Sequence, residues 1–191
     1  MDYSFFALIS RLKNIDRWAL MRNADRENVQ EHSHMVAVLA HALGLIRRDI
    51  FGGDCDPDRA AAAALFHDAP EILTGDMPTP VKYHDGDMIE AYRRIEDAAV
   101  RKLASSLPPE LRHSYEELLR IPEDVGDLVH AADKLAAYIK CLEELKTGNE
   151  EFRSAAEGTL RKLRGLNMKE ADYFLEHFVP AFSKTLDELT I

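Results

Sequence analysis

Two carboxylates in this 191-residue sequence occupy segments that otherwise have the composition of buried helices. Asp68 follows His67 and the apolar run of residues 60–66, and Asp133 has apolar residues at i−4, i+3 and i+4. A carboxylate buried in such surroundings needs a cation or several hydrogen-bond donors. The chain must therefore fold so that compensating groups reach both positions, and a divalent metal ion satisfies that requirement.

A third such segment begins at His32, which is followed by Val36, Leu39 and Leu43 at i+4, i+7 and i+11. This spacing predicts that the His32 imidazole projects from the core face of a helix. A single histidine on an apolar face is more often a hydrogen-bonded core residue than a ligand. Combined with the other three residues, however, His32 completes a set of two imidazoles and two carboxylates.

We predict one metal ion held by His32, His67, Asp68 and Asp133. These ligand types suit Co, Mn, Zn, Ni or Fe better than Ca or Mg, and do not select among the five. Neighbouring residues of a helix diverge by about 100°. His67 and Asp68 therefore share an ion only where helices carrying the other ligands cross their own helix.

The helix signals recur along the whole chain. Asp56-Pro57 is typical of an N-cap followed by proline at the first helical position, and Gly148-Asn149 is typical of a helix end. No apolar and polar alternation bounded by turn residues indicates a strand. We predict an all-α fold, a single-domain bundle over residues 1–191. Helices are expected near residues 4–13, 28–49, 57–69, 87–106, 109–119, 124–147, 150–164 and 168–187.

The composition narrows the class of partner. The net charge of −10 argues against a nucleic-acid polymer, although a metal ion with Arg17 and Lys82 can attract a small anion locally. The apolar stretch of residues 5–9 is too short to span a membrane or to serve as a signal segment, so a cytoplasmic location is expected. Two cysteines without metal-type spacing favour reduced thiols.

The order His, His-Asp, Asp on an all-helical chain resembles the HD-domain metal-dependent phosphohydrolases. The flanking motifs resemble more closely their bacterial 5'-deoxynucleotidase branch, nearly end to end. The segments that carry this resemblance are Arg17-Trp18, Glu31-His32-Ser33, His67-Asp68-Ala69-Pro70-Glu71, Thr74-Gly75-Asp76-Met77-Pro78-Thr79-Pro80-Val81-Lys82, Tyr138-Ile139-Lys140-Cys141-Leu142-Glu143-Glu144, Asp172-Tyr173-Phe174 and Phe178-Val179-Pro180.

The resemblance implies removal of phosphate from deoxyribonucleoside 5'-monophosphates by an HD-type helical bundle with a central metal site. Arg17 would then hold the phosphate, and Trp18 would pack against the sugar and exclude a 2'-hydroxyl. Glu71 and Asp76 are the spare carboxylates for acid and base catalysis, in an order that the sequence leaves open. The segment Asp76-Met77-Pro78-Thr79 would line the substrate pocket, to which the metal ligands His32, Asp68 and Asp133 also belong.

Three alternatives follow from the same residues. Another HD phosphohydrolase chemistry, on a deoxynucleoside triphosphate or a cyclic nucleotide, would use the same ligands. A non-catalytic helical module would use the metal for structure, but a structural site is closed by four protein ligands and needs no spare carboxylates.

The apolar C-terminal segments 173–175 and 178–182 indicate either packing within the domain or a homodimer, and the family resemblance favours the homodimer.

Overall fold

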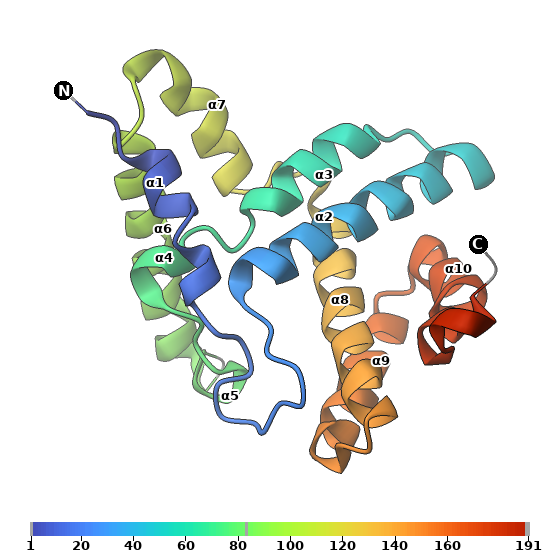
Figure 1. Ribbon diagram of the computed structural model, residues 1–191. Coiled ribbons are helices and arrows are strands. Elements are labelled where there is room, and N and C mark those ends of the chain that lie inside the picture. Colours follow the sequence, from blue (N-terminus) through green and yellow to red (C-terminus); the bar gives the residue numbers. More distant parts are fainter. Residues whose placement is uncertain (1, 83, 190–191) are drawn as a thin grey trace.

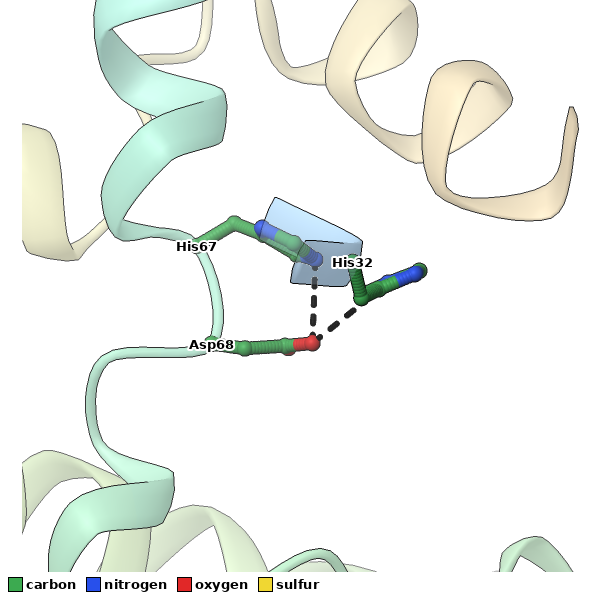
Figure 2. A group of neighbouring side chains, drawn as sticks. All are labelled: His32, His67 and Asp68. Atoms are coloured by element: carbon green, nitrogen blue, oxygen red, sulfur yellow. Dashed lines mark ion pairs between the residues drawn. The ribbon is translucent and has the colours of Figure 1, made fainter. Parts of the chain in front are cut away.

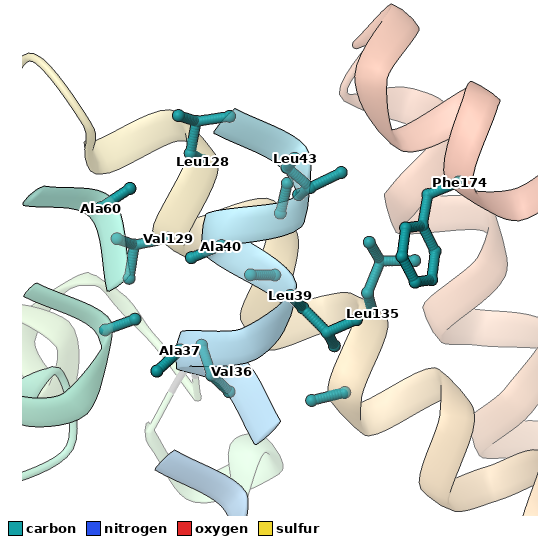
Figure 3. Close-up of a cluster of buried hydrophobic side chains, with 14 of the residues drawn as sticks. Val36, Ala37, Leu39, Ala40, Leu43, Ala60, Leu128, Val129, Leu135 and Phe174 are labelled. Carbon is teal, nitrogen blue, oxygen red and sulfur yellow. The ribbon is translucent and has the colours of Figure 1, made fainter. Parts of the chain in front are cut away.

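Helix α2 (Val29–Leu45) lies between α3 (Pro57–Phe66) and α8 (Gly126–Lys146), and these three helices enclose the principal core (Figures 1 and 3). The computed structural model describes residues 2–82 and 84–189, without the side chains of residues 79 and 80. Within these limits the chain is all-α, as predicted, with no strand. The other helices are α1 (Phe5–Ile9), α4 (Glu71–Thr74), α5 (Thr79–Lys82), α6 (Gly86–Ser105), α7 (Pro109–Leu119), α9 (Arg153–Gly165) and α10 (Lys169–His177).

A capping box sets the start of α2. The Asn28 side chain accepts a hydrogen bond from the Glu31 amide at 3.0 Å, and the Glu31 carboxylate accepts one from the Asn28 amide at 3.2 Å. These bonds satisfy two donors that the helix itself leaves unpaired. His32 consequently lies in the first turn, with no exposed surface, and Val36, Leu39 and Leu43 follow it into the core.

The start of α3 lies close against α2 because the contacting residues are small. The Asp56 side chain caps the helix by accepting from the Arg59 amide at 3.0 Å, and Pro57 follows as predicted. A Cβ atom added to Gly44 would lie 2.9 Å from the Pro57 Cα, so glycine is required at this crossing. The buried alanines of α3 continue the close contact. This packing directs the C-terminal end of α3 toward His32.

Several helix ends differ from the predicted ones. The predicted helix 57–69 ends at Phe66, and the predicted helix 168–187 ends at His177 before the 3₁₀ segment Val179–Ser183. Pro180, within that segment, lacks the amide that a continuing α-helix needs. The predicted helix 28–49 ends in a π-helical turn, Ile46–Ile50, and the predicted helix 4–13 breaks into α1 and the 3₁₀ turn Leu12–Asn14.

Two short helices occupy the stretch that follows the HD dipeptide. Helix α4 begins at Glu71 directly after Pro70, which stands where a helix has no internal donor to lose. Gly75 then ends α4 with a φ of 72°, a conformation that favours glycine. Helix α5 follows, and it begins at the last residue of the segment 76–79 that is expected to line the substrate pocket. Among the described residues, no helix is both long and apolar enough to cross a membrane.

Candidate functional site

His32, His67 and Asp68 form a compact group whose potential ligand atoms all lie within 4.8 Å of one another (Figure 2). The Asp68 Oδ2 atom lies 3.1 Å from His67 Nε2 and 3.6 Å from His32 Nε2. Two atoms that each bind a metal at about 2.1 Å, at right angles, lie about 3 Å apart. The observed separations are therefore those of atoms that share one ion.

The backbone solves the geometric difficulty that the sequence raised for His67 and Asp68. Both were predicted on a helix, where adjacent side chains diverge, but α3 ends at Phe66 and His67 is its C-cap residue. Asp68 lies in the turn that follows, where Figure 2 shows the chain leaving the helix. The two side chains approach each other at the end of α3, so the prediction that both residues lie within the helix was wrong while their pairing is observed.

Asp133 reaches the group from α8 through His32. The His32 Nε2 atom lies 3.0 Å from Asp133 Oδ1 at hydrogen-bonding distance. Asp133 is outside the compact group of three, and its side chain keeps 35% of its surface exposed. The hydrogen bond from His32 lowers the pKa of Asp133 to about 2, although burial acts in the opposite sense. The structure thus gathers three of the four predicted metal ligands in one compact group and places the fourth, Asp133, against His32.

The group has the donor set and electrostatics that a divalent cation requires. The Nδ1 atom of His67 lies 2.7 Å from the Ala64 carbonyl, so it donates there and leaves the Nε2 lone pair for a metal. That Nε2 atom is buried without a hydrogen-bond partner in the described part of the chain. Despite burial, Asp68 and Asp133 raise the pKa of His67 to about 9. The field that favours a proton on His67 also favours a bound cation.

A cavity of about 420 Å³ adjoins the group, and Arg17 stands between them. The guanidinium Nη1 atom donates to Asp68 Oδ2 at 3.3 Å, while the side chain also lines the cavity. Trp18, Asp76, Met77 and Pro78 line the same space, as predicted. The Thr79 side chain lies outside the described residues, so the structure does not test its predicted role.

Helix α9, although far from Arg17 in the sequence, forms another wall of this cavity. Its contribution comes from residues one helical turn apart: Ala155, Gly158, Thr159 and Lys162. The sequence analysis missed this wall, because a small or polar helix face carries no signal for a substrate. In Figure 1, the loop that bears Arg17 lies between α5 and α9. The cavity is therefore enclosed by two loop segments and one helix.

Two carboxyl groups beside the metal group have raised pKa values. Burial, reinforced by the negative charges of Asp68 and Asp76, raises the pKa of Glu71 to about 9. Its Oε2 atom is buried without a hydrogen-bond partner among the described residues. Burial also raises the pKa of Asp76, against the opposing effect of Arg17. Glu71 therefore keeps its proton at pH values at which an ordinary exposed carboxyl has lost it, and the pKa of Asp76 is shifted in the same direction.

The segment that bears Arg17 and Trp18, residues 15–28, is here termed the Arg17 loop. Its tip is bound by Glu144 of α8, whose carboxylate accepts hydrogen bonds from the Ala24 amide at 2.8 Å and the Asp25 amide at 3.2 Å. Lys140, one turn earlier on α8, donates hydrogen bonds to the Asp25 carbonyl and to the Glu144 carboxylate. Both α8 side chains are buried.

Sequence reasoning missed the roles of Lys140 and Glu144, which it included only as part of the family resemblance. Their i, i+4 spacing on a face that also carries Ala136 and Cys141 was the available signal, since a charged pair on a buried face needs partners. Glu27, whose carboxylate contacts both Arg17 and Trp18, was missed as well. No periodicity marks it, because it lies in the loop itself.

The all-α fold, with His32, His67 and Asp68 grouped at its centre, is that of an HD-domain phosphohydrolase. A solved HD-domain phosphohydrolase from Listeria innocua superposes with a TM-score of 0.81 at 25% identity, over 94% of this chain and 88% of that one. A cyanophage S-2L HD phosphohydrolase, solved with dA and one catalytic Zn²⁺ ion, shares the fold with a TM-score of 0.62 at 21% identity, over 94% of this chain and 99% of that one.

The chain belongs to the family described as 5'-deoxynucleotidase YfbR-like, whose model matches residues 4–182. A 5'-deoxynucleotidase from Erwinia tasmaniensis is 49% identical over 189 residues, which cover 97% of this chain and 96% of the relative. One from Photorhabdus laumondii is 46% identical over 190 residues, covering 98% and 96%. The family resemblance and the HD-type fold stated from the sequence are confirmed.

Proposed function

We propose that this chain, a 5'-deoxynucleotidase by family, hydrolyses deoxyribonucleoside 5'-monophosphates at one divalent metal ion held by His32, His67, Asp68 and Asp133. The observation that carries the proposal is the position of Arg17, which touches a metal-group carboxylate at 3.3 Å and also lines the adjoining cavity. A phosphate at that border lies within reach of both. The remainder of the nucleotide then has a cavity of suitable size.

The Arg17 guanidinium is suited to a phosphate because its planar fork of donors holds two oxygens at once. A divalent ion in the group supplies a water acidified toward neutral pH and polarises a phosphoryl oxygen. Asp76 lines the cavity on the side of the sugar, so we assign it the proton for the departing 5'-oxygen. Glu71, which does not line the cavity, accepts the proton of the attacking water.

The raised pKa values support these two roles. Asp76 retains its proton to higher pH than an ordinary aspartate, as a proton donor must. Burial raises the pKa of Glu71 to about 9 in the metal-free protein, and a bound dication would lower it, so the carboxylate that a base requires would form when the ion binds. An acid on the leaving-group side and a base on the water side are what an in-line displacement requires.

We assign the sugar to Trp18 and the base to the space beyond it. The Trp18 ring stacks obliquely on Phe152, with centroids 5.3 Å apart, and so presents a fixed wall to the cavity. A fixed ring leaves no room for an added 2'-hydroxyl. The base then extends toward α9, where small residues such as Ala155 and Gly158 do little to distinguish one base from another. Discrimination is therefore by sugar more than by base.

Release of phosphate from matched deoxy- and ribonucleoside monophosphates, with Co, Mn, Zn, Ni and Fe in turn, tests the activity. Hydrolysis of triphosphates or cyclic nucleotides in preference to monophosphates would contradict it. Trp18→Ala should lower the ratio of deoxy to ribo kcat/KM, whereas Arg17→Ala should depress both alike, since both substrates carry the phosphate. An unchanged ratio in Trp18→Ala would return that residue to a packing role.

We also propose a homodimer formed through the C-terminal region. Phe178 keeps 45% of its surface exposed and its ring contacts that of the buried Phe174, while Leu186, later in the chain, keeps 72% exposed. Two-fold symmetry is the commonest closed assembly and would cover such a patch. Light scattering of the full chain should give twice the monomer mass of 21.6 kDa. A monomer at working concentrations would overturn this assignment.

A further inference from the structure

One carboxylate oxygen of Glu27 contacts the side chains of both Arg17 and Trp18. The Glu27 Oε2 atom accepts a hydrogen bond from Arg17 Nε at 3.1 Å and another from Trp18 Nε1 at 3.1 Å. The contact is largely shielded from water, since the Glu27 side chain is 15% exposed and that of Arg17 is 12% exposed. A shielded, charge-assisted hydrogen bond fixes geometry more firmly than a surface ion pair does.

The backbone keeps Glu27 beside these two residues. The Arg17 amide donates to the Glu27 carbonyl at 2.9 Å, and the Val29 amide donates to the Ile15 carbonyl at 3.0 Å. These bonds, with the antiparallel bridge between Asp16 and Asn28, close the base of the Arg17 loop. Glu27 therefore stands directly across the loop from Arg17, and its side chain does not depend on a distant element for its position.

The contact determines which edge of the guanidinium faces the cavity. Glu27 holds the Nε atom, and Asp68 accepts from Nη1 at 3.3 Å. Within the described residues Nη2 has no protein acceptor, which leaves it for a ligand. Arginine can rotate about several bonds, so a partner at Nε removes most of that freedom before a ligand arrives.

Trp18 needs a comparable restraint because its backbone is unusual. Its φ of 57° lies in the left-handed region, which costs a bulky residue energy and which the surroundings must enforce. The indole N–H donates to Glu27, and the ring packs against Phe152. The Trp18 ring is thus restrained by one polar and one aromatic contact.

We infer that Glu27 is a positioning residue that sets the Arg17 guanidinium and the Trp18 ring in one arrangement, so that phosphate binding and sugar discrimination depend on the same carboxylate. This inference rests on the proposed function for the roles of Arg17 and Trp18. It adds a residue to which neither sequence reasoning nor the family resemblance gave a role. Glu27 touches no reacting atom, and its effect passes entirely through its two partners.

The test compares Glu27→Gln with wild type on dAMP and AMP. The amide keeps the size and an acceptor oxygen but loses the charge, so both hydrogen bonds lose their charge assistance and hold their donors less firmly. We expect KM for dAMP to rise about tenfold with kcat changed less than about threefold, and the deoxy to ribo ratio of kcat/KM to fall at least about fivefold. Glu27→Asp, which retains the charge, should recover part of the KM. Glu157→Gln, an exposed charge change on α9, should match wild type.

A double-mutant cycle separates positioning from general destabilisation. Trp18→Phe keeps a ring but removes the N–H donor, so it should lower the deoxy to ribo ratio by itself. The double variant with Glu27→Gln should show no further loss, because both changes break one contact. Metal content and melting temperature are measured for each variant.

The outcomes distinguish this inference from the function on which it rests. A wild-type protein that does not hydrolyse dAMP overturns the proposed function. A wild-type protein that does so, with KM and ratio unchanged in Glu27→Gln, overturns only the positioning role. The positioning role is also overturned if the deoxy to ribo ratio of the double variant falls by the product of the two single-variant losses. If Glu27→Gln fails to fold, an unchanged ratio in Trp18→Phe alone overturns the coupling.

Discussion

The metal group and the Arg17 loop lie side by side but are held in place by different means. His32 and Asp133 stand on long helices, and His67 caps a third, so core packing fixes their positions. The Arg17 loop contains no helix, and it is positioned by hydrogen bonds that the carboxylates of Glu27 and Glu144 accept. The proposed metal ligands are thus placed by hydrophobic packing, whereas the proposed substrate contacts are placed by shielded polar groups.

Because different interactions hold the two regions in place, we expect a mutation that disrupts one region to leave the other intact. Loss of a metal ligand removes charge from a group whose helices remain packed. Loss of a loop anchor removes polar restraints while the core and its ligands stay in place. Mutations in each region, ranked by expected effect, test whether the separation holds.

The largest effect is expected from Asp68→Ala and Asp133→Ala. Each removes a ligand anion, which should cost more than the roughly 10- to 100-fold loss in affinity that follows removal of an outer partner of a metal site. Metal analysis of the purified variants, with kcat/KM, measures it. Asp58→Ala, at a side chain that is 94% exposed, serves as the control. Full metal occupancy with normal turnover in either ligand variant would contradict the assignment.

Glu71→Gln should retain its metal and lose about 10²- to 10⁴-fold in kcat, because it removes a proton-transfer group without removing a ligand. Single-turnover kinetics with dAMP, alongside metal content, separates chemistry from binding. If the metal is lost together with the activity, Glu71 belongs to the ligand set instead.

Glu144→Ala tests the anchor of the loop tip. It leaves Lys140 buried without its carboxylate, a change that costs about 3 to 5 kcal/mol where the surroundings stay folded. The Arg17 loop relieves that cost by detaching, so we expect faster amide hydrogen exchange at residues 22–27 with metal content retained. A variant that loses metal in proportion to loop protection would show that the two regions are not separable.

The pH dependence of the same anchor has a definite sign. Despite burial, hydrogen bonds from Lys140 and the loop amides lower the pKa of Glu144 to about 2, below its usual value of 4.5. Its stabilising effect is fully present above pH 4.5 and is lost as pH falls through 2. Exchange at residues 22–27 should therefore accelerate in acid before the core helices exchange.

At Glu71, beside the metal group, the pH dependence of stability has the opposite sign. Because burial raises the pKa of Glu71 to about 9, this residue keeps a proton in the folded metal-free protein that the unfolded chain releases at about 4.5. Stability of the metal-free protein should fall as pH rises from 4.5 to 9, and Glu71→Gln should gain about 3 kcal/mol at pH 7, at 1.36 kcal/mol per pKa unit. Chemical denaturation in chelator at pH 5 and 7 measures it. A gain that is equal at both values would contradict this origin.

The smallest effect is expected at the helical wall of the cavity. A Cβ atom at Gly158 would meet nothing within 4 Å, so Gly158→Leu fills cavity space without straining the protein. It should lower kcat/KM for dAMP about tenfold more than for TMP, since the larger base needs that space. Gly165→Leu is the matched control, because Gly165 has equally free surroundings and does not line the cavity. Equal losses for both bases would place the base elsewhere.

The same contrast explains how much the sequence predicted. His32 and Asp133 were found because helical periodicity reports which side of a helix is buried. The helix that ends at Phe66 was predicted too long, because alanine-rich periodicity does not mark the point at which a chain leaves a helix to bring His67 and Asp68 together. Boundaries depend on local hydrogen bonds, which periodicity does not contain.

The loop residues were predictable only by family resemblance. Arg17 and Trp18 were assigned because their motif is familiar, and no pattern within the chain would have placed them beside Asp68. Glu27 and Glu144 illustrate why, since their partners are a neighbouring side chain in one case and backbone amides about 120 positions away in the other. Contacts of this kind follow from the tertiary fold and leave no periodic trace.

The closed base of the Arg17 loop has an evolutionary consequence. Because the bridge between Asp16 and Asn28 and the bond from Val29 to Ile15 close the loop at the very start of α2, insertions or replacements between these residue pairs need not disturb the helix that carries His32. A lineage can then exchange the segment that contacts the substrate while inheriting the metal ligands unchanged. Grafting a loop of different length onto these two residue pairs is accordingly a direct route to a new substrate on the same scaffold.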